Sequence, residues 1–209
     1  MDEGLLLFRN LAFFRKIEDK VRGDELEGLH MDMPVNGFHI ILQNGQRLKA
    51  KQFTNCINPE RVFAFCLSTA LDQKLFDEFK SDVCIKITNV PSFLTRCSQI
   101  ISSISGTTHF AFGPVEYYHF DRKTERNIKD PKNIPLFKHS AYSHQREFRI
   151  YFSLGDALQL TKHIIIEGNP FGLPQDTSPK SEPELVARTV RLGPLHSIAE
   201  VIRRDSICT

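Results

Sequence analysis

One run of sequence decides the fold: HQREFRIYF, residues 144–152. Successive side chains of a strand point to opposite sides of the sheet, so this run predicts a strand with two unlike faces. A carboxylate held beside an amide and a guanidinium suggests chemistry on the polar face, and the alternative is a solvated strand face with a cross-strand ion pair. The polar face carries Gln145, Glu147, Arg149 and Tyr151, and the apolar face carries Phe148, Ile150 and Phe152.

Strand-like runs also dominate the sequence on both sides of this run. Apolar or alternating runs predict strands at residues 5–9, 37–43, 47–53, 62–68, 83–88, 110–120, 161–167 and 185–192. Apolar residues at helical spacing predict helices at residues 11–20, 71–80, 93–104 and 195–203. Asn44-Gly45 between two strands predicts a type I′ hairpin. These elements predict an α+β fold, with a mixed, mostly antiparallel sheet and a few flanking helices.

Length and composition predict a single domain over residues 1–209. Of the 209 residues, 41% are hydrophobic and 25% are charged, which suffices for one cored domain and is short for two. The charged, proline-interrupted segment 121–140 is expected to be a mobile surface loop. The segment 168–183, rich in Pro, Gly and Ser, separates the last two expected strands.

Charge, cysteines and histidines exclude several classes of protein. The net charge of +2 lacks the excess of Lys and Arg that a dedicated nucleic-acid module carries. Five cysteines without a Cys-x-x-Cys pair are typical of reduced thiols, and no run resembles a signal peptide or a membrane span, so we expect a cytoplasmic protein with no membrane partner. The eight histidines lack metal-ligand spacing, and Asp24, Glu25 and Glu27 fit a loop role, so no metal site is expected.

Three short motifs follow one another along the expected strands. Arg9 ends the first strand, Ser68-Thr69 ends a middle strand, and Gln145-Arg146-Glu147 opens the late strand. In this order they resemble the pattern of ADP-ribosyltransferases of the arginine, serine, glutamate class. The resemblance implies an ADP-ribosyltransferase-like fold and NAD as a substrate.

The same resemblance implies a role for each of these residues. Glu147 and Gln145 would be catalytic, with Glu147 holding the nicotinamide ribose hydroxyl and Gln145 addressing the acceptor. A fixed carboxylate suits this reaction because cleavage between nicotinamide and ribose develops an oxocarbenium-like cation. The NAD-binding residues would be Arg9, Ser68, Thr69 and Arg149.

A looser resemblance covers most of the chain. The runs LLFRNL (6–11), RGDELEG (22–28), FCLS (65–68) and QREFR (145–149), with Lys138, look like a poorly characterised group of bacterial proteins. Their end-to-end pattern is similar to that of nucleic-acid-modifying ADP-ribosyltransferase toxins. This implies a toxin or anti-phage defence effector that acts on a nucleic acid or a protein, with an antitoxin as a partner. Those toxins begin with an earlier strand bearing a His or Tyr for NAD, so here Arg9 takes that role or the NAD site is incomplete.

The sequence leaves two non-catalytic alternatives open. A binding module would hold single-stranded nucleic acid through the basic segment 122–138 and the aromatic run 110–120. A toxin-associated interaction module would keep a degenerate transferase fold without the reaction.

Overall fold

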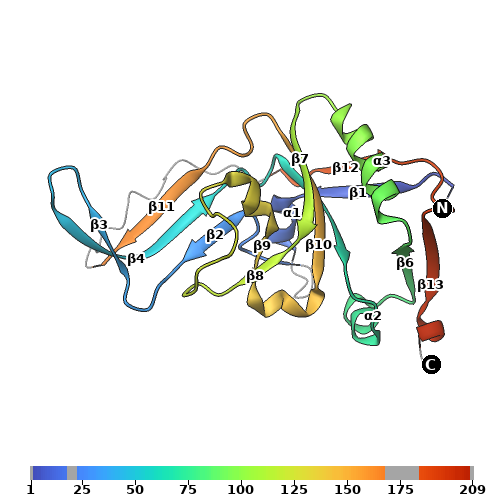
Figure 1. Cartoon of the computed structure of the whole chain (residues 1–209), viewed down its shortest axis with the longest axis horizontal. Coiled ribbons are helices and arrows are strands. Elements are labelled where there is room, and N and C mark those ends of the chain that lie inside the picture. The colour runs from blue at the N-terminus through green and yellow to red at the C-terminus, as the bar shows by residue number, and fades with distance from the viewer. Residues whose placement is uncertain (1, 18–22, 168–183, 208–209) are drawn as a thin grey trace.

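The structure is a computed structural model that describes residues 2–17, 23–167 and 184–207 (Figure 1). Its strands are β1 (Leu5–Asn10), β2 (Leu29–Asp32), β3 (Phe38–Ile41), β4 (Arg47–Cys56), β5 (Val62–Ser68), β6 (Val83–Ile87), β7 (Thr107–Pro114), β8 (Glu116–Tyr118), β9 (Phe137–His139), β10 (Glu147–Leu154), β11 (Thr161–Ile166), β12 (Ala187–Arg191) and β13 (Ala199–Arg203). Its helices are α1 (Leu11–Lys16), α2 (Gln73–Phe79) and α3 (Val90–Ser102), with the 3-10 helices η1 (Pro131–Leu136), η2 (Ser140–Gln145) and η3 (Arg204–Ile207). The expected mixed α+β class, mostly antiparallel with few helices, is confirmed.

A central sheet organises the molecule. Its strand order is β12-β1-β5-β10-β7, and every neighbouring pair is antiparallel. Glu147, the first residue of β10, lies opposite Ser68, the last residue of β5. On the other side of β5, Arg9 of β1 pairs with Ala64. Ala64 and Ser68 share one face of β5 because alternate residues point the same way, so Arg9, Ser68 and Glu147 project from the same face of the sheet.

The opposite, apolar face of β10 forms the main core. Phe152 stacks on Phe63 of β5, with ring centroids 5.2 Å apart, and meets Phe8 of β1 edge to face at 5.4 Å. Helix α3 contributes Phe93 and Ile101 to this core from one side of its helical surface. The alternation predicted for β10 therefore directs its phenylalanines inward.

The second face of β10 is buried too, which corrects the picture of a solvated strand face. Tyr151 packs with Leu11 of α1 and Ile134 of η1 in a second core cluster. Glu147 and Arg149, nearer the start of the strand, are also buried. A polar strip therefore lies next to an apolar one on the same face of the sheet.

Gln145 lies outside the strand, contrary to the prediction. It is the last residue of η2, and Arg146 follows it in the left-handed conformation at φ 44°. This turn ends the 3-10 helix and starts β10 at Glu147. Strict alternation predicts the directions of the side chains only from Glu147 onward.

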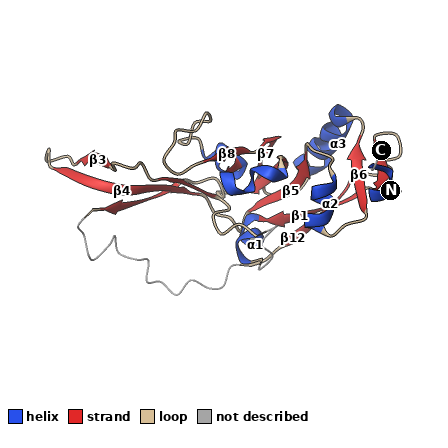
Figure 2. Ribbon diagram, turned by 90° about the horizontal axis from the view of Figure 1, so that it is seen from below, coloured by secondary structure: helices blue, strands red, loops and turns tan. Residues whose placement is uncertain are grey.

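A second sheet, made of β2, β3, β4 and β11, extends away from the central sheet as an arm (Figures 1 and 2). The expected hairpin of β3 and β4 is present, but its turn is not type I′. That turn needs positive φ at both central residues, and Asn44 has none, whereas Gly45 has φ 82°. Leu42 and Gln46 still pair through the Leu42 N–H at 2.9 Å, so the loop covers residues 43–45.

The C-terminal segment 195–203 is not the expected helix. Its second half forms β13, which pairs with β6 and places Val201 opposite Ile85 and Ala199 opposite Ile87. So short an apolar run fits helical and strand spacing equally well. Pairing with β6 selects the strand over the helix, and β6 is distant from this segment in sequence.

Two further expectations about elements are wrong. The run 110–120 forms two strands, because β7 ends at Pro114, which has no N–H to donate, and β8 pairs instead with β9. The segment 121–140 is not a surface loop throughout, since Ile134 and Phe137 are buried at its end. The segment 168–183 lies outside the described residues. Among the described residues, no helix is both long and apolar enough to cross a membrane.

Replacing Phe152 tests the main core. Phe152→Ala removes a fully buried ring that contacts two others, so we expect a loss of about 3 to 5 kcal/mol in the free energy of unfolding, measured by urea denaturation. Phe112→Ala on β7 is the control, because that side chain is 47% exposed. Equal losses in the two variants would contradict this assignment of the core.

Candidate functional site

A cavity of about 520 Å³ opens on the polar part of the sheet, at the start of β10. Four phenylalanines form its apolar wall: Phe13, Phe14, Phe65 and Phe79. The charged and amide side chains that line it, with one hydroxyl, are Arg9, Glu27, Ser68, Lys138, Gln145, Glu147 and Arg149. The cavity brings together every site residue expected from the sequence except Thr69, which lines a neighbouring pocket.

The guanidinium of Arg149 lies at the centre of the polar floor. Its Nε donates to Glu147 Oε1 at 2.5 Å and its Nη2 donates to Glu147 Oε2 at 3.4 Å. Toward Glu27, Nη1 donates to Oε2 at 2.8 Å and Nη2 donates to Oε1. Nη1 also donates to the carbonyl of Pro135 in η1 at 2.8 Å. All five donors of the guanidinium are therefore used, and only 1% of the residue is exposed.

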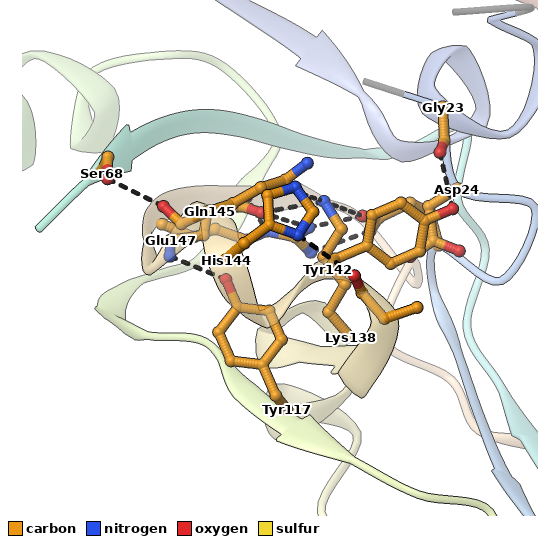
Figure 3. A network of polar contacts seen from close by, with 12 residues as sticks. Gly23, Asp24, Ser68, Tyr117, Lys138, Tyr142, His144, Gln145 and Glu147 are labelled. Carbon is orange, nitrogen blue, oxygen red and sulfur yellow. Dashed lines mark hydrogen bonds and ion pairs between the residues drawn. The ribbon is translucent and has the colours of Figure 1, made fainter. Parts of the chain in front are cut away.

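Lys138 supplies the second cation of the floor. Its Nζ donates to Glu147 Oε2 at 3.0 Å and to Gln145 Oε1 at 2.9 Å, and it lies 3.9 Å from Glu27 Oε1. The ring of Tyr142 lies 4.8 Å from the same ammonium group. Figure 3 shows Lys138 between Glu147 and Tyr142, with Gln145 beside it. One ammonium group thus holds both residues expected to be catalytic.

The surroundings of Glu147 keep its carboxylate charged. Burial disfavours the charged form, but Arg149 and Lys138 outweigh it and lower the pKa of Glu147 from 4.5 to about 2. Lys138 is also held in its charged form. Burial alone would lower its pKa, but the negative charges of Glu147 and Glu27 outweigh burial and raise it. Glu147 is therefore a fixed anion in the cavity wall at neutral pH.

Glu27 completes a cluster of two carboxylates and two cations. Burial raises its pKa, against the attraction of Arg149 and Lys138. With Glu27 ionised, the four formal charges of Glu27, Glu147, Lys138 and Arg149 sum to zero. Buried charges are tolerated when they are paired and hydrogen-bonded in this way.

The turn before β10 is held by the end of β5. The hydroxyl of Ser68 donates to the carbonyl of Gln145 at 2.8 Å, a contact drawn in Figure 3. Thr69 donates to the carbonyl of Arg146 through its N–H at 2.8 Å and its hydroxyl at 3.0 Å. These bonds hold Arg146 in a conformation that non-glycine residues seldom adopt. Ser68 and Thr69 therefore position Gln145 and Glu147.

Arg9 is the cavity cation with the most freedom. Its guanidinium carbon lies 4.5 Å from the centre of the Phe13 ring, and it forms no ion pair within the described part of the chain. The side chain is half-buried and lines the cavity. Arg9 can therefore meet an incoming anion, whereas the donors of Arg149 are already used.

Sequence reasoning missed Glu27 and Lys138. Glu27 was expected to be a loop acid, and it lies 122 residues from its partner Arg149. Lys138 was assigned to a surface loop, yet only 5% of it is exposed, because β9 places it beside β8 in the interior. Its position after Ile134, Leu136 and Phe137 is the one local signal of burial.

Comparison with protein families, curated proteins and solved structures finds no match to this chain. The chemistry of the cavity is therefore the guide to its function. The described residues contain no group of three or more His, Cys, Asp or Glu side chains placed to hold a metal ion.

Replacing Arg149 tests the charge cluster. Arg149→Met leaves Glu27 and Glu147 buried without their shared cation, so we expect a loss of about 3 to 5 kcal/mol in the free energy of unfolding. Arg149→Lys keeps the charge but loses the two-pronged contacts to Glu27 and Glu147, so its loss should be smaller. Chemical denaturation measures both, and a methionine variant as stable as the wild type would contradict the role assigned to Arg149.

The low pKa of Glu147 predicts how stability depends on pH. Its folded value of about 2 lies below its ordinary value of 4.5, so its contribution is fully present above about pH 4.5 and is lost as the pH falls toward 2. Glu147→Gln should therefore lose less stability than the wild type between about pH 5 and pH 2. Thermal unfolding across this range gives the comparison, and parallel curves would contradict the assignment.

Proposed function

We propose that this protein is an NAD-dependent ADP-ribosyltransferase. The observation that carries the proposal is the meeting of Arg9, Ser68, Gln145 and Glu147 at one cavity. Glu147 supports it most directly, because its low pKa keeps the carboxylate charged and two buried cations fix its orientation. A carboxylate held in place in advance stabilises positive charge as that charge develops.

The proposed reaction replaces nicotinamide with an acceptor at the ribose. The bond between ribose C1′ and the nicotinamide nitrogen breaks, and its electron pair leaves with nicotinamide. The acceptor nucleophile forms the new bond to C1′ and releases its proton to water. Glu147 accepts a hydrogen bond from a ribose hydroxyl and stabilises the oxocarbenium-like charge, as carboxylates do in glycoside cleavage. Gln145, held beside Glu147 by Lys138, faces the acceptor.

The two arginines of the cavity have different roles in the proposed reaction. Arg9 is the counter-ion for the NAD pyrophosphate, because no acid of the described chain is paired with it. Arg149 is a positioning residue, because all its donors are used by Glu27, Glu147 and Pro135. The phenylalanine wall offers apolar surface to the rings of NAD, as ligand cavities commonly do.

NAD labelled in its ADP-ribose part tests the proposal. The wild type should release nicotinamide and transfer label to a nucleic-acid or protein acceptor. Glu147→Gln should lower kcat by about two to three orders of magnitude, because the charge that stabilises the transition state is lost. Arg9→Ala should mainly raise KM for NAD. Nicotinamide release and acceptor labelling are measured in parallel.

Arg203→Ala is the matched control, because Arg203 is an exposed arginine of β13 outside the cavity. Its kcat and KM should equal those of the wild type. Circular dichroism establishes whether each variant is folded. If Glu147→Gln does not fold, Arg9→Ala still tests the cavity, because Arg9 is outside the buried cluster. Undiminished transfer by a folded Glu147→Gln variant, or a wild type that neither binds nor cleaves NAD, would refute the proposal.

A further inference from the structure

The arm is the largest feature of the molecule that the proposed reaction does not use. Beyond β2, the residues of the arm tip project from the rest of the structure as the hairpin of β3 and β4, with β11 alongside (Figures 1 and 2). Val35, in the connection between β2 and β3, is 86% exposed, and Ile41, near the tip, is 65% exposed. Neither of the two core clusters contains a residue of this hairpin, so a partner is the natural explanation for it.

The hairpin of β3 and β4 carries positive charge without acids of its own, and the acids beside it are Asp32, at the end of β2, and Glu167, directly after β11. No Asp or Glu occurs from residue 33 to residue 59, whereas the whole chain has 25 acids against 27 Lys and Arg. Arg47, Lys49 and Lys51 alternate along the outer half of β4 with the less exposed Leu48 and Ala50. Alternate residues of a strand share a face, so the three cations form one exposed row.

Only part of this charge is balanced within the molecule. Glu167 lies 2.8 Å from Lys49 and 3.7 Å from Lys51, so one carboxylate serves two ammonium groups. Arg47 has no ion pair with the described residues, and the exposed His39 on β3 lies opposite Lys49. Amide side chains extend the polar surface around the tip: Gln43, Asn44 and Gln46. Cations in a row with amides beside them match a phosphate backbone and the edges of bases.

We infer that the arm docks duplex DNA. Beyond the last pairing of β11 with β4, in which Ile166 lies opposite Ala50, the arm is the two-stranded ribbon of β3 and β4. Such a ribbon fits the major groove of B-form DNA, which is about 12 Å wide, while lysine and arginine at its surface contact the phosphates. Duplex RNA fits less well, because its major groove is deep and narrow and closed to side chains.

Single-stranded nucleic acid fits the arm less well than duplex DNA. Its binding uses exposed aromatic rings on which bases stack. The described arm has two phenylalanines, Phe38 and Phe53, and both are half-buried and pack edge to face with centroids 6.5 Å apart. The arm therefore offers charge and amides without an aromatic platform.

DNA binding by the arm does not depend on the proposed reaction. A second statement, that the bound DNA is also the acceptor of ADP-ribose, rests on the proposed function. In that case the arm would hold the acceptor near the cavity. Binding measured without NAD separates the two statements, because a protein that binds DNA and transfers nothing would fail the proposed function and keep the docking surface.

Fluorescence anisotropy with a labelled DNA duplex, over a series of salt concentrations, tests the inference. The variant carries Arg47→Gln, Lys49→Gln and Lys51→Gln, which removes three exposed charges and leaves the core untouched. We expect its Kd to rise at least about tenfold and the slope of log affinity against log salt to fall by about 2 to 3, since each phosphate contact contributes about 0.9. Duplex RNA and single-stranded DNA should bind more weakly than duplex DNA.

The matched control removes the same charge from the surface segment after β8. Arg122→Gln, Lys123→Gln and Lys129→Gln also change three exposed cations and should leave Kd within about twofold, because these residues are not on the arm. Wild-type affinity in the arm variant, an equal loss in the control, or preference for RNA or single strands would overturn the inference. A wild type that forms dimers through the arm and ignores DNA would overturn it as well, and gel filtration reports that outcome.

Discussion

The guanidinium of Arg149 is the contact on which the candidate site depends. It joins the start of β10, through Glu147, to η1, through the carbonyl of Pro135, and to the loop before β2, through Glu27, which lies 122 residues away in sequence. A planar group with five donors can give two hydrogen bonds to each of two carboxylates and one to a carbonyl at once, whereas an ammonium group has only three donors. Lys138 then balances the remaining negative charge. Each of the four charged side chains in the cavity floor is therefore paired with an opposite charge.

Local periodicity was enough to predict much of the sheet. The alternation of β10 from Glu147 onward, the strand β5 and the β3–β4 hairpin each follow from patterns within ten residues or so of sequence. The predictions fail where contacts with residues distant in sequence determine the local conformation. Residues 195–203 pair with β6, and the turn at Arg146 is held by the end of β5, so neither conformation is encoded locally. Such tertiary contacts override the secondary-structure propensity of a short segment.

The residues of the site also divide into those that the sequence predicts and those that only tertiary contacts reveal. The resemblance implied that Arg9, Ser68 and Glu147 act at one site, and antiparallel pairing through β5 brings the three to one face of the sheet. Glu27 and Lys138 escaped prediction, because nothing near them in sequence distinguishes a buried, paired charge from a solvated one. The use of all five donors of Arg149 inside the cluster could not be predicted either, since it depends on contacts formed in three dimensions.

The 122-residue separation of Glu27 and Arg149 also bears on how the protein is made. During synthesis the N-terminal part leaves the ribosome first, and contacts of such long range form only after both partners are available. A nascent chain that ends before β10 lacks Glu147, Arg149 and one wall of the cavity altogether. The site therefore exists only in a chain that extends through β10, so termination before Glu147 yields a fragment without it.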